Sequence, residues 1–250
     1  MSTPDLTGRT VLITGAARRI GAAVARGLHA AGANLAVHFH RSAAPAEQLV
    51  GELNKARPRS ALAMGGDLLD DHTPGNLVRQ VVHAFGRLDI LINNASTFYP
   101  TPLGSITARE WNDLMGTNLR APLFLSQAAA PELRKHRGSI VNMIDIHALR
   151  PLPHHPVYSS AKAGLAMLTR SLARELAPDV RVNGIAPGPI LWPEGGEMSA
   201  DLKEEIISKT LLKRTGSPED IVRTLMFFVA DAPYVTGQIL AVDGGRSVGW

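Results

Sequence analysis

The sequence predicts an α/β fold: a single Rossmann-type domain with a doubly wound, parallel, seven-stranded sheet and helices on both faces. Short aliphatic runs alternate along the 250-residue chain with longer segments of helical periodicity. The short runs are apolar at consecutive positions, as expected for strands covered by helices on both sides. No linker, repeat or low-complexity segment interrupts this alternation, so we expect one domain over residues 1–250.

The first half of the chain contains four expected strands with three helices between them. The first strand, RTVLITG, is rich in β-branched and aliphatic residues, and the helix after it ends at Gly32, a residue type that commonly terminates helices. The predicted strands are 9–15, 34–40, 60–68 and 88–96, and the predicted helices are 19–32, 44–56 and 76–86.

The second half continues the alternation around one longer connection. The predicted helices are Trp111 to Arg134, 157–178 and 218–230, and the predicted strands are 138–144, 180–188 and 238–245. A loop-and-helix excursion lies between the last two strands, from about Pro189 to Arg214, and its Glu194-Gly195-Gly196 stretch is consistent with a flexible lid.

Composition argues against several classes of protein. The chain has no cysteine, which excludes disulfides and thiolate metal sites, and its nine histidines do not match a metal-binding spacing. The basic residues behind the net charge of +4 are dispersed, so we do not expect a nucleic-acid partner. No apolar run approaches the ~20 residues that span a bilayer, and the N-terminal segment does not resemble a signal peptide. We therefore expect a cytoplasmic protein without a membrane partner.

The junction after the first strand, TGAARRIG from Thr14 to Gly21, favours phosphate binding. Its glycines let the backbone approach a pyrophosphate, and the helix that follows offers unpaired N–H groups at its N-terminus. Because ligands bind beyond the carboxyl ends of the strands in such sheets, the turn lies where a dinucleotide is expected. Alone, the turn is a weak signal; its place between a strand and a helix strengthens it.

The end of the second strand, HFHRSA, indicates which dinucleotide is bound. NAD-binding folds usually place an acidic residue here for the ribose hydroxyls, whereas an arginine accommodates a 2′-phosphate. No Asp or Glu occurs between Gly32 and Glu47, while Arg41 and Ser42, assisted by His40, can form a phosphate cradle. The sequence therefore predicts NADPH/NADP+ as the cofactor.

Tyr158 and Lys162 are four residues apart in a predicted helix and therefore share one of its faces. A tyrosine is a poor acid–base group near neutral pH unless a nearby cation favours its anion. We expect Lys162 to supply that cation. Asp145 lies thirteen residues before the tyrosine, at the end of a predicted strand.

Four motifs in this order resemble the short-chain dehydrogenase/reductase family over essentially the whole chain. They are TG-x₅-G after the first strand, NNA at 93–95, Asn118 in the central helix, and Tyr158-x₃-Lys162. The resemblance implies a nicotinamide cofactor, a homotetramer, and a role for Asn118 in kinking the central helix and positioning a water near the lysine. One departure is Arg19, which occupies a position where the family usually has glycine.

A second departure is Asp145, because most members of the family have serine at that position. One interpretation is an inactive relative that has lost a catalytic residue. The other is a different substrate, since a carboxyl group can relay a proton to a ring nitrogen. The second is favoured because NNASTFYPTPL, TGAARRIG, HFHRS and the Asp145–Tyr158–Lys162 set together resemble the pteridine reductase branch of the family.

That resemblance implies a role for each site residue. Asp145, Tyr158, Lys162 and Asn118 would be catalytic. Arg19, Ser96, Phe98, Asp145, Tyr158 and Trp192 would contact a pterin or folate, with Phe98 stacking over the ring and the segment 187–214 acting as the substrate loop. The cofactor would be held by Gly15, Arg18, Arg19, Ile20, His40, Arg41, Ser42, Asp67, Leu68, Asn94, Ala95, Ser96, Tyr158, Lys162, Pro187, Gly188 and Ile190.

The resulting hypothesis is an NADPH-dependent reductase of dihydropterins, such as dihydrobiopterin or dihydromonapterin, or of dihydrofolate. In it, Tyr158 would supply or relay the proton with the help of Lys162 and Asp145. Two alternatives stay open at this point: a ketone or acyl-carrier reductase on the same fold, and a non-catalytic NADP(H) sensor. Intact Tyr158, Lys162 and Asn118 argue against the sensor.

Overall fold

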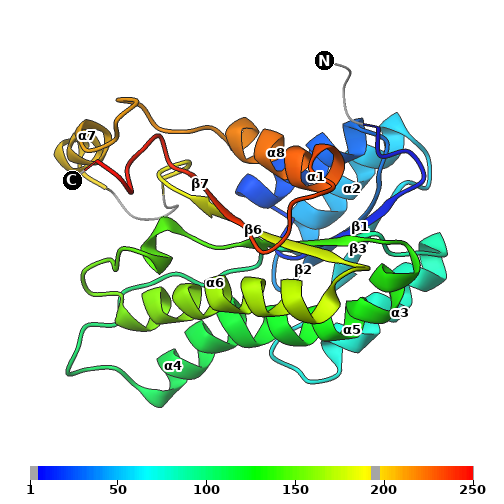
Figure 1. The fold of residues 1–250 in the computed structure, drawn as a ribbon, viewed down its shortest axis with the longest axis horizontal. Coiled ribbons are helices and arrows are strands. Elements are labelled where there is room, and N and C mark those ends of the chain that lie inside the picture. Colours follow the sequence, from blue (N-terminus) through cyan, green and yellow to red (C-terminus); the bar gives the residue numbers. More distant parts are fainter. Residues whose placement is uncertain (1–4, 193–197, 250) are drawn as a thin grey trace.

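The computed structural model describes residues 5–192 and 198–249, and these form a three-layer α/β arrangement (Figure 1). Seven parallel strands make one sheet in the order β3-β2-β1-β4-β5-β6-β7. The strands are β1 (Thr10–Ile13), β2 (Asn34–Phe39), β3 (Ala61–Gly65), β4 (Ile90–Asn93), β5 (Ser139–Met143), β6 (Arg181–Pro187) and β7 (Ile239–Val242). The predicted fold class and the predicted strands are confirmed.

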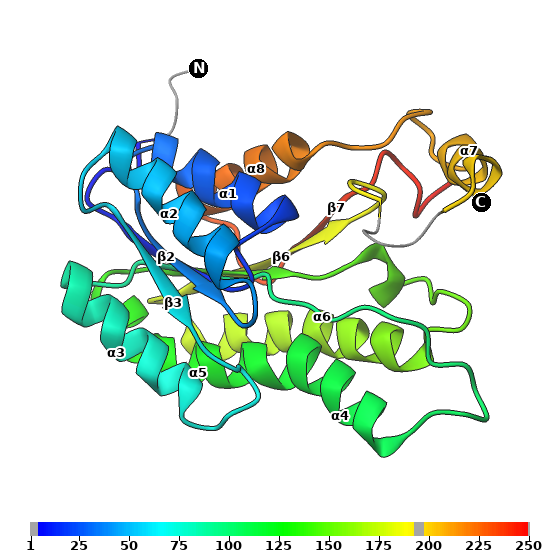
Figure 2. The ribbon, with the colours of Figure 1, turned by 180° about the vertical axis from the view of Figure 1, so that it is seen from behind.

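Helices cover both faces of this sheet, which explains why its strands are apolar at nearly every position. Figures 1 and 2 show α1, α2 and α8 on one face and α3, α4, α5 and α6 on the other. Separate apolar clusters fill the two interfaces between sheet and helices. The helices are α1 (Arg19–Ala30), α2 (Ala43–Ala56), α3 (Thr73–Phe85), α4 (Ala108–Met115), α5 (Ala121–Lys135), α6 (Pro156–Leu176), α7 (Ala200–Ser208) and α8 (Pro218–Met226).

The central helix differs from the single regular helix predicted from Trp111 to Arg134. It begins earlier, at Ala108, because Thr107 and Glu110 form a capping box. A π-helical turn at Gly116–Arg120 then separates α4 from α5. The side-chain amide of Asn118 donates to the carbonyl oxygen of Leu114 at 2.9 Å. That oxygen is the acceptor a regular α-helix would offer to the backbone N–H of residue 118, so the side chain competes with the helical ladder.

Two further short turns are not expected from the sequence. A 3₁₀ turn, η2 (Ile146–Ala148), follows β5, and a π-helical turn at Phe227–Asp231 continues α8. The excursion after β6 contains α7, while the expected lid residues Glu194, Gly195 and Gly196 lie outside the described residues. None of the described helices combines the length and the apolar character needed to cross a membrane.

Two glycines let the first strand–helix junction pack tightly against the end of β4. Gly15 has a φ of +60°, and a Cβ added there would lie 2.9 Å from the Cα of Ala95. A Cβ on Gly21 would lie 2.7 Å from both the amide nitrogen of Asn94 and the carbonyl oxygen of Gly15. Any side chain at either position would therefore separate β1 from β4 at the edge where a ligand is expected.

We predict opposite stability effects for alanine at Gly21 and at Gly51. Gly21→Ala should lower the free energy of unfolding by roughly 1–3 kcal/mol, because backbone atoms must shift to accept the methyl group. Gly51 lies inside α2, and a Cβ added there would meet no atom within 4 Å. Gly51→Ala should therefore raise the free energy of unfolding by about 0.5–1 kcal/mol. Urea unfolding of both variants checks this, and equal effects would contradict the tight junction.

Candidate active site

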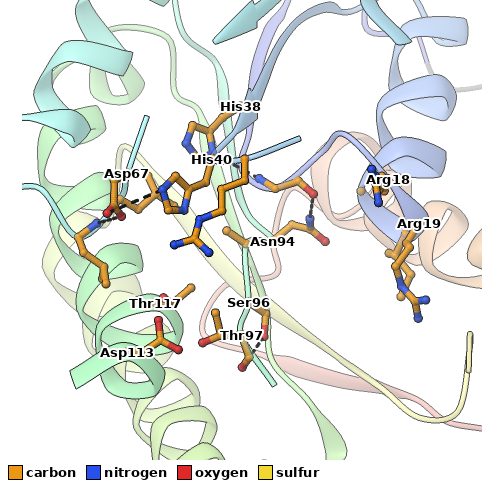
Figure 3. Close-up of a pocket in the computed structure, with 17 residues that line it drawn as sticks. Arg18, Arg19, His38, His40, Asp67, Asn94, Ser96, Thr97, Asp113 and Thr117 are labelled. Atoms are coloured by element: carbon orange, nitrogen blue, oxygen red, sulfur yellow. Dashed lines mark hydrogen bonds and ion pairs between the residues drawn. The ribbon is translucent and has the colours of Figure 1, made fainter. Parts of the chain in front are cut away.

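A cavity of about 680 Å³ opens at the carboxyl ends of β1, β2, β3 and β4 (Figure 3). Figure 3 shows Arg18 and Arg19 on one side of it and His40 with Asp67 on the other. The lining residues are Gly15, Arg18, Arg19, Ile20, Gly21, His38, His40, Arg41, Asp67, Leu68, Leu69, Asn94, Ala95, Ser96, Thr97, Asp113 and Thr117. The cavity thus gathers most of the residues predicted to hold the cofactor.

Asn94 and Thr14 connect the turn between β1 and α1, which is predicted to bind phosphate, to the end of β4. The amide of Asn94 donates to the carbonyl oxygens of Thr14 and Gly15, at 2.8 and 3.0 Å. In return, the Thr14 hydroxyl oxygen accepts from the backbone N–H groups of Asn94 and Ala95. This reciprocal pairing explains why a Thr-Gly sequence and an Asn-Ala sequence occur at neighbouring strand ends.

His38 supports the same turn from β2, a role that the sequence does not indicate. Its Nδ1 accepts from the backbone N–H of Gly15 at 3.4 Å, and its Nε2 lies 3.0 Å from the carbonyl oxygen of Gly66. Its own carbonyl oxygen accepts from Ala16 N–H. Burial lowers the pKa of His38 to about 4, which fits a neutral ring that donates only through Nε2. The available signal is a histidine inside an otherwise apolar strand.

The far side of the cavity carries the residues predicted to recognise a 2′-phosphate. Arg41 and His40 line it, and His40 Nε2 lies 3.9 Å from the carboxylate of Asp67. Ser42 precedes α2 and is not among the lining residues, so the structure does not bring it to this cavity. Because β2 is followed by Arg41 rather than an acid, and Arg18 adds a second cation, the site suits an anionic nucleotide.

Arg19 joins the phosphate-type turn to the loop after β6. Its guanidinium donates to the carbonyl oxygens of Trp192 and Leu191, at 3.0 and 3.3 Å. Its backbone has a φ of 54°, a left-handed conformation that suits the glycine usual at this position and costs a side-chain-bearing residue about 1 kcal/mol or more. The arginine therefore combines a strained backbone conformation with side-chain contacts to the loop after β6.

Asp145 and Tyr158 form the hydrogen bond at the chemical end of the site. The Tyr158 hydroxyl donates to Asp145 Oδ2 at 2.7 Å, and Asp145 Oδ1 accepts from the backbone N–H of His147 at 2.8 Å. The second contact caps the 3₁₀ turn η2, so the carboxylate is fixed by local backbone as well as by the tyrosine. Both carboxylate oxygens of Asp145 therefore have hydrogen-bond partners, which argues against an inactive relative that has lost the function of this position.

Lys162 is fully buried beside this pair, and its ammonium donates to the carbonyl oxygen of Met143 at 2.9 Å. Burial lowers the pKa of Lys162 to about 8, against an opposing effect of Asp145. The surroundings of Tyr158 oppose the tyrosine anion that Lys162 is expected to favour. Burial and the adjacent Asp145 carboxylate instead raise the pKa of Tyr158 far above its ordinary value, so Tyr158 is neutral.

Ser96 and Asn118 connect the loop after β4 to the central helix. The Ser96 hydroxyl donates to Asn118 Oδ1 at 2.6 Å, and the Asn118 amide donates to the carbonyl oxygen of Thr97 at 2.9 Å. The same amide distorts the helix at Leu114, in line with the kink that the family resemblance implies. Asn118 therefore positions the loop that carries Phe98.

Phe98 reaches the chemical end of the site. Its ring stacks on His155 with centroids 4.8 Å apart and an interplanar angle of 10°, and it meets Tyr158 edge-on at 4.8 Å. Nearly half of the Phe98 side chain is exposed. A flat ligand can therefore meet an aromatic surface close to the tyrosine hydroxyl. The sequence does not single out His155, because it offers only two adjacent histidines in a proline-rich loop.

The remaining predicted residues lie away from the 680 Å³ cavity. Ile190 is buried in the apolar cluster under α1 and α8, so its side chain is part of the core. Gly188 packs against Asp243, to which a Cβ would approach within 2.6 Å. The ammonium of Lys203 lies 5.9 Å from the centroid of the Trp192 ring. The members of the predicted cofactor set that do not line the cavity are Ser42, Tyr158, Lys162, Pro187, Gly188 and Ile190.

Other lining residues are missed by sequence reasoning. Gly21 and Thr97 lie within motifs that the sequence reveals, whereas Asp113 and Thr117 come from the central helix. Their four-residue spacing puts them on one helical face, but nothing in the sequence shows that this face meets the cavity. Among the residues that the structure describes, no group of three or more metal-ligating side chains occurs.

Comparison with known proteins agrees with this geometry. The family model described as Enoyl-(Acyl carrier protein) reductase matches residues 15–247. Pteridine reductase 1 of Leishmania tarentolae is 37% identical, over 98% of this chain and 99% of the relative. A 3-oxoacyl-[acyl-carrier-protein] reductase of Staphylococcus aureus is 36% identical, over 95% and 97%. The 3beta-hydroxysteroid dehydrogenase 1 of Eggerthella lenta is 33% identical, over 98% and 95%.

The names of these relatives point to different substrates, yet each relative aligns with this chain over nearly its whole length. Together with the parallel sheet, the glycine turn and the buried tyrosine–lysine pair, they show that the chain belongs to the short-chain dehydrogenase/reductase family of oxidoreductases.

Proposed function

We propose that the chain is an NADPH-dependent pteridine reductase that converts dihydropterins, and also dihydrofolate, to their tetrahydro forms. The observation that carries this proposal is the 2.7 Å hydrogen bond from the Tyr158 hydroxyl to the carboxylate of Asp145. The usual serine of the family offers a hydroxyl to a substrate carbonyl, whereas a carboxyl group can hold a proton for a ring nitrogen. The full-length similarity to a pteridine reductase supports the same substrate class.

The charges at the site favour a proton relay through Tyr158. A tyrosine anion beside Asp145 is unfavourable, because two negative charges would then share a buried site. If Asp145 is protonated when the substrate binds, its proton passes to the Tyr158 oxygen while the tyrosine proton passes to the ring nitrogen. Tyr158 then stays neutral throughout, and the new charge resides on Asp145, where the Lys162 ammonium offsets it.

The cofactor side of the site supports NADPH. Arg18 and Arg41 supply positive charge to the cavity, and Arg41 lies where NAD-binding folds place an acid. Gly15 and Gly21 leave room for the backbone to approach a pyrophosphate. When bound, the reduced nicotinamide supplies the hydride. Phe98 offers the aromatic surface that holds a pterin ring near Tyr158.

A second candidate is a 3-oxoacyl-[acyl-carrier-protein] reductase. It is favoured by the 36% identity to such enzymes, which is close to the 37% identity to the pteridine reductase. Asp145 speaks against it, because this residue replaces the serine whose hydroxyl usually donates to a substrate carbonyl in the family. The homotetramer and the cytoplasmic location stay predictions; exposed Trp111, Leu123 and Phe124 on α4 and α5 support assembly through that face.

We predict that Asp145→Ala lowers kcat for 7,8-dihydrobiopterin with NADPH by about 10²-fold or more, the loss usual for a proton-transfer group. Asp145→Asn serves as the control for shape, and it should be nearly as slow because an amide cannot supply the proton. Asp145→Ser should not restore pterin turnover. NADPH oxidation, followed by absorbance with dihydrobiopterin, dihydromonapterin, dihydrofolate and acetoacetyl substrates, compares the variants with the wild type. Undiminished pterin turnover by Asp145→Ala would overturn the proposal.

We predict that Arg41→Ala raises the KM for NADPH by about tenfold, because one phosphate contact is lost, while the KM for NADH changes little. Arg137→Ala, which removes a cation just beyond the C-terminal end of α5, is the matched control. Equal effects of Arg41→Ala on the two cofactors would contradict 2′-phosphate recognition. Steady-state kinetics with both cofactors at a fixed dihydropterin concentration gives the comparison.

We predict opposite pH dependences for activity and for the contribution of Lys162 to stability. With a pKa of about 8 in the fold, Lys162 loses its charge above pH ~8, and kcat should then fall because Asp145 is no longer offset. The unfolded chain keeps that proton up to the ordinary pKa of 10.5, so it binds more protons than the fold between these values. The free energy of unfolding therefore gains on the order of 3 kcal/mol from Lys162 as pH rises through this window.

Denaturant unfolding and kcat measured from pH 7 to pH 10.5 check both signs. Lys162→Met should be inactive and should lack the rise in stability that the wild-type protein shows in this window. Lys55→Met, at an exposed position in α2, should keep the wild-type pH profiles. If the free energy of unfolding changes with pH in the same way in the wild type, Lys162→Met and Lys55→Met, the lowered pKa of Lys162 is contradicted.

A further inference from the structure

A second cavity, of about 590 Å³, begins immediately after Asp145 and is separate from the cofactor cavity. Its walls come from the 3₁₀ turn η2, the loop before α6, the end of α7 and the segment after β7. Figures 1 and 2 both show this C-terminal segment returning to α7. The lining residues are Ile146, His147, Arg150, Pro151, Leu152, Pro153, Ser208, Lys209, Leu211, Lys213, Arg246, Ser247 and Gly249.

The cavity carries a concentrated positive charge. Arg150, Lys209, Lys213 and Arg246 line it, and its described lining includes no Asp or Glu. Lys209 pairs with Glu205 at an exposed position. Lys213 and Arg246 instead donate to backbone carbonyl oxygens, those of Ser208 and Ile206 in the last turn of α7. These contacts hold the two side chains at the C-terminal end of α7, where the helix dipole favours cations, and Arg246 also interacts electrostatically with Glu205.

Apolar groups form the rest of the wall. Ile146, Leu152 and Leu211, with two prolines, surround the cations. Apolar walls with a few placed charges are typical of sites for small organic ligands, and the volume lies within the usual range for them. The chemistry fits an elongated ligand with an aromatic or methylene stem and one or more anionic groups.

We propose that this cavity binds the carboxylate-bearing tail of a substrate whose ring is reduced at Tyr158, namely the benzoyl-glutamate tail of dihydrofolate. The inference rests on the proposed function and specifies its substrate class. The connection between the two places is short: the backbone N–H of His147, a lining residue, is hydrogen-bonded to Asp145. In the proposed arrangement the ring lies next to Asp145, and its substituent follows η2 into the cavity that Lys213 and Arg246 line.

The backbone conformation of Lys213 is a further observation that supports an anionic ligand. Its φ is 52°, a left-handed conformation that strains a residue with a side chain and in which glycine would be unstrained. The chain thus has a strained lysine at a position where its described side-chain hydrogen bond goes to a backbone carbonyl oxygen. The charge stabilises the C-terminal end of α7, and it also gives the cavity a cation that an anionic ligand can contact.

Lys213→Gly separates these two roles, because it removes the charge and relieves the backbone at the same time. We expect its thermal stability to be equal to or above that of the wild type. The ratio of KM for dihydrofolate to KM for 7,8-dihydropteroate, which lacks the glutamate, should rise by about fivefold, the loss of one partly exposed charge pair. Arg246→Gln should raise the same ratio, and the double variant should raise it further.

Lys55→Gly is the matched control, and it should leave the KM ratio unchanged because it lies in α2 outside both cavities. Raising ionic strength should increase the wild-type ratio, and phosphopantetheine used as an inhibitor tests for an anionic tail of the acyl-carrier type. Equal KM changes for dihydrofolate and dihydropteroate, or inhibition by phosphopantetheine that depends on Lys213, would overturn the glutamate subsite. Wild-type turnover of dihydrobiopterin in the same assays shows independently whether the proposed function holds.

Discussion

The carboxylate of Asp145 is the constraint on which the chemical end of this site depends. One of its oxygens shapes the 3₁₀ turn after β5, and the other holds the hydroxyl of Tyr158. The turn in turn carries the residues that begin the cationic cavity. A single side chain therefore sets the position of the tyrosine, the charge beside it and the entrance to a neighbouring site. A serine at this position could cap the turn, but it could not impose the same charge.

That charge also gives the buried ammonium of Lys162 an electrostatic partner of opposite sign. Asp145 and Lys162 form a buried pair of opposite sign around a neutral hydroxyl, and the desolvation of the lysine shows in its lowered pKa. Such an arrangement lowers the free energy of unfolding, because a charge loses its hydration when it is buried and only a well-placed partner offsets that loss. The proposed proton-transfer group thus lies where the fold gives up stability.

The fold could be predicted from the sequence because the strand runs and helical periods are consistent with each other along the whole chain, and because strand ends in a parallel sheet meet at one edge. The π-helical turn could not, since it depends on the side chain of Asn118 competing for one carbonyl oxygen, which leaves periodicity unchanged. The identities of Asp145, Tyr158 and Lys162 were readable as motifs. The direction of the tyrosine pKa was not, because it depends on a distance between residues from two elements. His38 and Ile190 show the same limit: their roles follow from burial.

Arg19 physically links the two halves of the site. Its guanidinium spans from the turn before α1 to the carbonyl oxygens of Leu191 and Trp192, so any ligand phosphate that attracts it must compete with those oxygens. Binding is thermodynamically reciprocal. If a ligand at this loop changes the affinity for the phosphate, the phosphate changes the affinity for that ligand by the same factor. A glycine at position 19, the usual residue of the family, has no side chain with which to make this link.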